Sequence, residues 1–294
     1  MRYLTIFSVL LFISFTSCNK KNDPDPDQVA YDNADLALGG KLYDKLYASE
    51  TGFVSPSDAS VNLDDIKLFG DFYRCKSCHG WDLRGNLESY INRGPTTTRP
   101  NVASSNLFMA LPSMSIRQVF DAVKHANGAA IDPARTADGT NSSLGGDNMA
   151  NYGKIFTDEQ IWNLVKFLKE GVFDVDQLYD ITVSGTYPTG SRTFSNIGKD
   201  GNATAGAAFY DSNCASCHGA NGRDDGAGTI IAINANIGLS MGQFARSKPY
   251  ELQHKARFGQ LGSSPLMTGV SSATLTDIKD MLKALADTNN YPDL

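Results

Sequence analysis

One short pattern occurs twice in this chain of 294 residues: two cysteines separated by two residues and followed directly by a histidine. The copies are Cys75-Lys76-Ser77-Cys78-His79 and Cys214-Ala215-Ser216-Cys217-His218, and together they use four of the five cysteines. This pattern is typical of covalent haem c attachment, in which both thiols add to the haem vinyl groups and the adjacent histidine becomes the proximal iron ligand. The sequence therefore predicts two covalently bound haem c groups, held by Cys75, Cys78 and His79 and by Cys214, Cys217 and His218.

Three other uses of paired cysteines fit the chain less well. Two such pairs can form a zinc cage of four thiolates, but these pairs lie far apart in the sequence, and zinc requires no histidine directly after each pair. A redox-active dithiol does not need that histidine either. Structural disulfides occur in exported chains, but the loop between the two cysteines is tight for a stable bridge. Haem attachment accounts for both histidines.

The N-terminus has the pattern of an export signal. Arg2 is followed by an apolar run over residues 4–15, too short to span a bilayer, and then by small residues up to Cys18. Residues 1–17 resemble a bacterial lipoprotein signal peptide, with Cys18 as the lipidated first residue of the mature chain; a simple secretory peptide is the alternative. We therefore expect a periplasmic or cell-surface protein that is anchored to the outer membrane and contacts the membrane through its lipid only.

The segment after the signal and the overall charge limit the partners. Residues 18–34 begin with a polar, charged stretch containing two prolines, which predicts a flexible tether. The chain has 26 basic and 32 acidic side chains and a formal net charge of −6 at pH 7. This balance argues against a nucleic-acid partner and favours a basic redox partner protein or simple solubility.

The same order of segments occurs in both halves of the chain. Each half has a helix before its cysteine motif, a later helix, a methionine and a closing amphipathic helix. Capping-box pairs mark two helix starts in the first half, Ser115 with Gln118 and Thr157 with Gln160. The pattern predicts a first domain over residues 35–172, a linker over 173–199 with a short β-hairpin, and a second domain over 200–294.

With this order and both motifs, the chain resembles class I cytochrome c domains arranged in tandem. The resemblance implies an all-α fold of two haem-binding domains, in each of which the N- and C-terminal helices cross. It also suggests Arg84 and Arg223, each five residues after its motif histidine, as partners of haem propionates; an exposed loop arginine is the alternative. The family usually carries a proline whose carbonyl orients the proximal histidine, for which the first domain offers Pro95 or Pro100.

The second axial ligand of each iron is expected to be a methionine in the loop before the closing helix. These positions are occupied by Met149 in the first half and Met267 in the second. A methionine thioether raises the reduction potential relative to a second imidazole. The alternatives are as follows: Met109, Met114 or His125 for the first iron, and Met241 or His254 for the second.

The expected function is electron transfer between redox partners of the cell envelope, without catalysis. The alternative is a dihaem oxidoreductase with one open haem, either peroxidase-like or thiosulfate dehydrogenase-like. Against the latter, every cysteine already has an expected role, so none is left to ligate iron. The long polar loop over residues 127–148 is a candidate lid over an open first haem. A haem-based sensor or scaffold is a third possibility that the sequence does not address.

Overall fold

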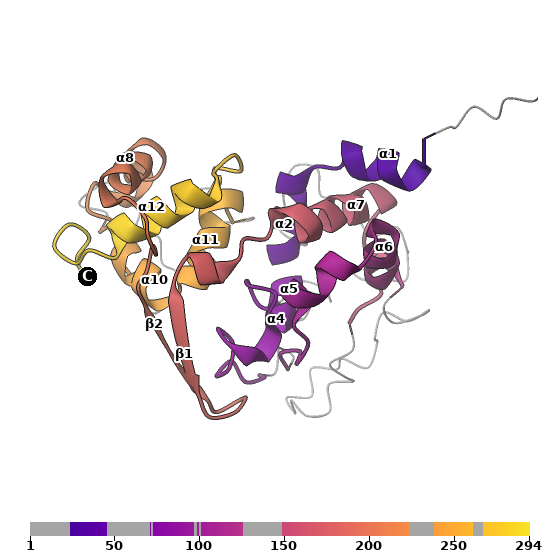
Figure 1. Cartoon of the computed structure of the whole chain (residues 1–294), viewed down its shortest axis with the longest axis horizontal. Helices are drawn as coiled ribbons and strands as arrows, with labels where there is room; N and C mark the ends of the chain where they lie inside the picture. The colour runs from indigo at the N-terminus through magenta and orange to yellow at the C-terminus, as the bar shows by residue number, and fades with distance from the viewer. Residues whose placement is uncertain are drawn as a thin grey trace, which may run out of the picture.

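The computed structural model describes residues 24–45, 71, 73–96, 99, 101–125, 149–223, 238–260 and 267–294. The expected signal peptide, the lipidation site Cys18 and the loop over residues 127–148 lie outside these residues. The described residues form two helical modules that lie side by side (Figure 1). Within them, no helix is long and apolar enough to cross a membrane.

The first module is made of short helices around one apolar core. The N-terminal helices are α1 (Pro26–Asn33) and α2 (Leu36–Asp44), followed by α4 (Cys75–His79), α5 (Leu107–Ala110), α6 (Ile116–Lys124) and α7 (Asp158–Lys166). Both predicted capping boxes are present, at Ser115 before α6 and at Thr157 before α7. The apolar faces of α2, α6 and α7 meet in a core that includes Tyr43, Phe120 and Leu164.

The second module begins with a β-hairpin and continues as helices. Strands β1 (Asp180–Ser184) and β2 (Ser191–Ser195) are antiparallel, with Asp180 opposite Ser195. The helices are α8 (Ala203–Asn213), α9 (Ala215–His218), α10 (Met241–Ser247), α11 (Pro249–Phe258) and α12 (Leu275–Leu285). The hairpin confirms the expected short β-structure, and it makes "all-α" only an approximate description of a mainly helical fold.

The terminal helices of each module cross at a glycine. A Cβ atom on Gly39 of α2 would lie 2.0 Å from the Asn163 carbonyl oxygen of α7, and one on Gly206 of α8 would lie 1.8 Å from the Asp280 carbonyl oxygen of α12. Only glycine lets the two backbones approach this closely. In each case the residue four positions later is a tyrosine, Tyr43 or Tyr210, so both modules are built on the same crossing.

The two modules share their cores. Phe258 of α11 belongs to the core of the first module, whereas Trp81, Tyr90 and Val102 of the first module belong to the core of the second. The linker also contributes, since Leu178 is fully buried in the second core. Burial of apolar side chains on both sides makes the contact a continuous interior and not a flexible joint.

Two expected boundaries differ from the structure. Residues 26–33 are not tether but helix α1, which packs on the first module through Tyr31, only 8% exposed, whose hydroxyl donates to Glu170 over 2.6 Å. Pro26 stands in the first helical turn, where proline is tolerated, and the Asp25 side chain caps the helix. The residues over 173–199 are likewise part of the second module's core and not only a linker.

Candidate haem-binding sites

Both cysteine motifs form a short helix that ends at the histidine. Helix α4 begins at Cys75 and ends at His79, and α9 ends at His218. In both cases the next residue is a glycine with positive φ, +77° at Gly80 and +75° at Gly219. Glycine adopts this conformation without steric cost, so it stops the helix directly after the histidine.

A tyrosine from the preceding helix holds each of these turns. The Tyr43 hydroxyl donates to the Gly80 carbonyl over 2.6 Å, and the Tyr210 hydroxyl donates to the Gly219 carbonyl over 2.9 Å. Each tyrosine lies four residues after a helix-crossing glycine. The helix crossing therefore fixes the turn that carries each motif histidine.

The motif of the first module opens into an apolar cavity of about 620 Å³ of empty space, including its solvent-open part. Its lining comes from α2, α4, α5, α6 and α7, from the turns that follow α5 and α7, and from the segment before α7: Tyr43, Cys75, His79, Leu107, Leu111, Met114, Val119, Ala122, Val123, Met149, Leu164 and Leu168. His79 and Met149, expected to ligate the first iron, therefore line one apolar space.

A second, more polar cavity, with about 410 Å³ of empty space including its solvent-open part, adjoins the first and shares Cys75, His79 and Met149 with it. Its other lining residues are Arg74, Cys78, Asn101, Ala103 and Tyr152. Arg74, Asn101 and Tyr152 were not predicted from the sequence as site residues. The position of Arg74 directly before Cys75 was a usable signal, whereas Asn101 and Tyr152 reach the site only through the fold.

The electrostatics of His79 suit a neutral ligand. Burial lowers the pKa of its imidazole to about 4, so the ring is uncharged at pH 7. The Nδ1 atom is buried and has no hydrogen-bond partner among the described residues. A neutral imidazole is the form that binds a metal, and such an unpaired buried atom is costly unless the site gains a further interaction.

The first cysteine of each motif is a protonated thiol at pH 7. Burial raises the pKa of Cys75 to about 12 and that of Cys214 to about 11. None of the four motif cysteines forms a disulfide, and no group of three or more metal-binding side chains forms among the described residues. Raised pKa values oppose a reactive dithiol, and the two pairs do not converge into a zinc cage. The residues of the first site therefore fit haem c.

The structure separates the alternatives for the first axial methionine. Met149 and Met114 both line the cavity with His79, whereas Met109 is 70% exposed on α5. His125 is exposed at the C-terminal end of α6. Met149 remains the expected ligand, with Met114 as its one structural rival among these residues.

The second site is described in part. His218 and Met267 are both half-buried, and the Gln260 N–H donates to the Met267 carbonyl over 3.0 Å. Met241 is only 6% exposed and packs against Gly222. His254 is 1% exposed, and its imidazole Nε2 donates to the Gly40 carbonyl of the first module over 3.0 Å. The structure thus gives His254 a partner in the other module.

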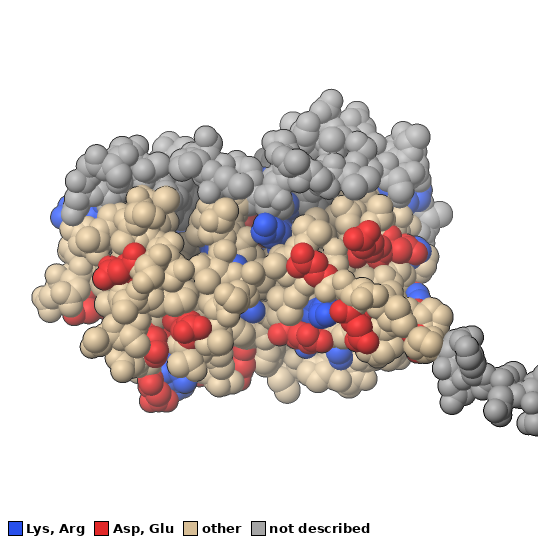
Figure 2. Space-filling view, turned by 90° about the horizontal axis from the view of Figure 1, so that it is seen from above, with Lys and Arg blue, Asp and Glu red and all other residues tan. Residues whose placement is uncertain are grey.

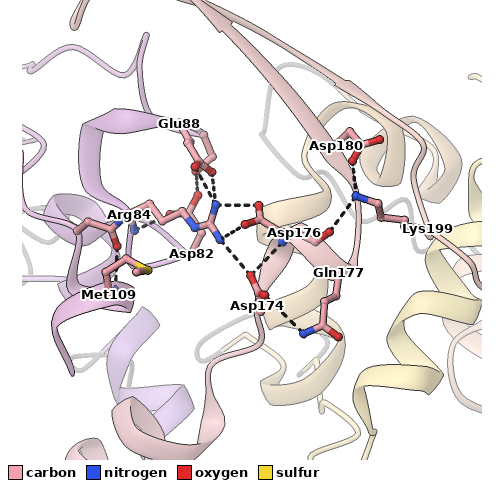
Figure 3. A network of polar contacts seen from close by, with 11 residues as sticks. Asp82, Arg84, Glu88, Met109, Asp174, Asp176, Gln177, Asp180 and Lys199 are labelled. Atoms are coloured by element: carbon pink, nitrogen blue, oxygen red, sulfur yellow. Dashed lines mark hydrogen bonds and ion pairs between the residues drawn. The ribbon is translucent and has the colours of Figure 1, made fainter. Parts of the chain in front are cut away.

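Arg84 has different partners from those expected. Its guanidinium binds the carboxylates of Glu88, Asp174 and Asp176 at 2.8–3.0 Å, which joins the first module to residues of the expected linker (Figure 3). We therefore do not assign Arg84 to a haem propionate. Its spacing from His79 gave no information on the two aspartates, which come from a distant part of the chain. Arg223 is exposed.

Two mainly helical modules, each with a Cys-x-x-Cys-His turn held by a tyrosine, define a class of electron-transfer proteins that carry covalently bound haem c. A family model described as Cytochrome c matches residues 67–171 and again residues 203–285, more than half of the chain. The chain therefore belongs to the cytochrome c family, with its domain present in tandem. No curated protein and no solved structure gives a significant match.

Proposed function

We propose that this cytochrome c is a dihaem electron carrier of the cell envelope, with His79 and Met149 on one iron and His218 and Met267 on the other. The observation that carries the proposal is the shared apolar cavity of His79 and Met149. With both of these protein ligands bound, each iron would have no open position for a substrate.

The protein's own residues have simple tasks in this role. Haem c, when bound, supplies a one-electron iron couple. The thiols of Cys75 and Cys78 would anchor it, the neutral imidazole of His79 would provide one nitrogen ligand, and the Met149 thioether would favour a higher potential. The apolar walls keep water away, so the protein contributes ligand identity, burial and a docking surface.

Carbon monoxide binding to the reduced holoprotein tests this function. We expect two haems per chain in a pyridine haemochrome assay and no spectral change on adding carbon monoxide, because both irons are six-coordinate. A Soret shift of about half the haem would contradict the carrier proposal. It would support instead the dihaem oxidoreductase, with peroxide or a small sulfur compound as the next substrate to test.

The proposed partners are redox proteins, and no nucleic acid is involved. In Figure 2 acidic side chains are spread over both modules. The basic side chains lie between them and form no continuous stripe on this face. Together with the net charge of −6, this favours a donor or acceptor with a basic docking surface.

The proposed location is the periplasm or cell surface, with the lipid on Cys18 holding the chain at the outer membrane. We expect Cys18→Ser to move the protein from the membrane fraction to the released fraction, because one residue carries the anchor. Immunoblots of the two fractions measure this, with Ser17→Ala as the matched control. Retention of the Cys18→Ser variant in the membrane would contradict the lipoprotein assignment.

A further inference from the structure

The last turn of α11 reaches into the first module. His254 and Phe258 are four residues apart and therefore lie on the same face of the helix. A Cβ atom on Gly40 would lie 2.6 Å from the Phe258 ring, so this ring packs directly on the α2 backbone. The His254 imidazole donates to the carbonyl of the same Gly40. A third contact comes from Arg257, whose Nη1 donates to the Gly171 carbonyl over 2.5 Å.

The same turn also holds the segment that carries Met267. The Val270 N–H donates to the Ala256 carbonyl over 2.8 Å, and the Gln260 N–H donates to the Met267 carbonyl over 3.0 Å. A Cβ atom on Gly259 would lie 2.1 Å from the Met267 carbonyl oxygen. The backbone of Met267 is therefore fixed closely against the end of α11.

The contact in the first module is itself rigid. Gly40 lies on α2 between the helix-crossing Gly39 and Tyr43, whose hydroxyl holds the turn after His79. The rings around His254 are also closely packed, with centroid distances of 4.8 Å to Trp81, 4.9 Å to Phe258 and 5.5 Å to Phe167. The end of α11 thus has one side seated in a packed core and the other bonded to the methionine segment.

We propose that His254 and Phe258 are positioning residues for Met267, so that the first module sets the place of the axial ligand in the second. The proposal rests on the proposed function, in which Met267 ligates the second iron. They act on Met267 through the end of α11, whose position they fix. The two haem sites are then coupled through one helix.

Substitution of His254 in the holoprotein tests the proposal. His254→Leu removes the hydrogen bond to Gly40, whereas His254→Gln keeps a side-chain amide donor and is the rescue variant. Phe258→Leu removes the aromatic ring that packs on Gly40, so it tests the same contact independently of the hydrogen bond. Tyr250→Phe is the matched control, since it changes a buried α11 residue whose hydroxyl accepts from Arg192 and not from the first module.

The measurements are amide hydrogen exchange at Gln260 and Val270, the red-edge absorption band of methionine-ligated ferric haem, and the potential of the second haem. We expect His254→Leu and Phe258→Leu to speed exchange at both amides by about tenfold. They should also weaken the band and lower the second potential. His254→Gln and Tyr250→Phe should remain close to the parent protein.

Unchanged exchange, band and potential in His254→Leu and Phe258→Leu would overturn the proposal, even if overall stability falls. Met267→Ala, measured alongside, separates this failure from that of the proposed function. If Met267→Ala lowers the second potential and the α11 variants do not, the ligand assignment stands and only the positioning role is wrong. If Met267→Ala leaves the potential unchanged, the ligand assignment and the positioning role are both wrong.

Discussion

Met149 and Met114 reach the His79 cavity from different parts of the chain, and only the former lies in the segment before the closing helix of its module. Met114 follows a turn of 3₁₀ helix, Leu111–Ser113, and its backbone carbonyl accepts from the Lys169 ammonium over 2.8 Å. This fixes the Met114 backbone at the rim of the site, so we expect its side chain to serve as part of the apolar wall.

Substituting the two methionines one at a time distinguishes ligand from wall. We expect Met149→Ala to lower the first haem's potential by roughly 0.1 V or more, within the ~0.8 V range that axial ligands span. Met114→Ala should leave the potential near its original value and cost stability through the cavity it creates. Redox titration followed by absorbance measures both. The opposite pattern would make Met114 the ligand.

His254 also makes the free energy of unfolding depend on pH. Burial lowers the pKa of its imidazole to about 3, from an ordinary value of 6.5. Between these pH values the unfolded chain binds a proton that the native chain does not, so stability is full above pH 6.5 and falls as the pH drops towards 3. The loss from this group is at most about 1.4 kcal/mol per pH unit.

Denaturant unfolding at pH 7 and at pH 4.5 checks this expectation. His254→Gln carries no titrating group at this position, so its stability should fall less between the two pH values than that of the parent protein. Equal losses in both proteins would show that other groups account for the acid sensitivity.

At the scale of helices, the crossings at Gly39 and Gly206 decide how each module closes. Intrinsic propensity alone favours alanine over glycine in a helix by about 1 kcal/mol. At Gly206 that gain is outweighed, because the new methyl group would overlap the Asp280 carbonyl oxygen and force α8 away from α12.

We therefore expect Gly206→Ala to destabilise the protein by about 1–3 kcal/mol, the usual range for overpacking. Thermal unfolding measures the change. Ser212→Ala on the exposed side of α8 is the matched control and should lie within about 0.5 kcal/mol of the parent. A stabilised Gly206→Ala variant would mean that the helices do not cross at this residue.

The helix ends that depend on local signals could be predicted from the sequence. Ser115 and Thr157 combine a hydroxyl cap with a glutamine three residues later, and both begin helices in the structure. Helix α1 was missed because its acidic and proline-rich start also fits a tether; the packing of Tyr31 on α7, which favours the helix, is a long-range contact. The motif histidines were predictable because each directly follows its pair of cysteines. Two partners of Arg84, Asp174 and Asp176, were not predictable because they lie far from it in the sequence.

At the scale of the molecule, the two modules share buried residues. The second core includes Trp81 and Tyr90 from the first module and Leu178 from the connecting segment, while Phe258 fills the first core. Separating the modules would expose all of these side chains to water. This contact could not be predicted from the sequence, because it depends on residues that face each other only in the folded protein.

We expect the whole chain to unfold in a single transition, monitored by far-ultraviolet circular dichroism and by Soret absorbance of each haem. A fragment of residues 200–294 lacks Leu178 and the first module, so it should show a lower midpoint or aggregate. Two separated transitions in the full chain, or a fragment as stable as the full chain, would contradict this picture.

The matching helix crossings of the two modules have a consequence for the origin of the chain. In each, a glycine at the crossing is followed four residues later by a tyrosine that bonds the glycine after the motif histidine. Such a three-part correspondence points to duplication of one ancestral gene segment. The copies have since diverged elsewhere, as in the much longer stretch between Tyr43 and Cys75 than between Tyr210 and Cys214. The two copies therefore differ in length beside a helix crossing that has the same geometry in both.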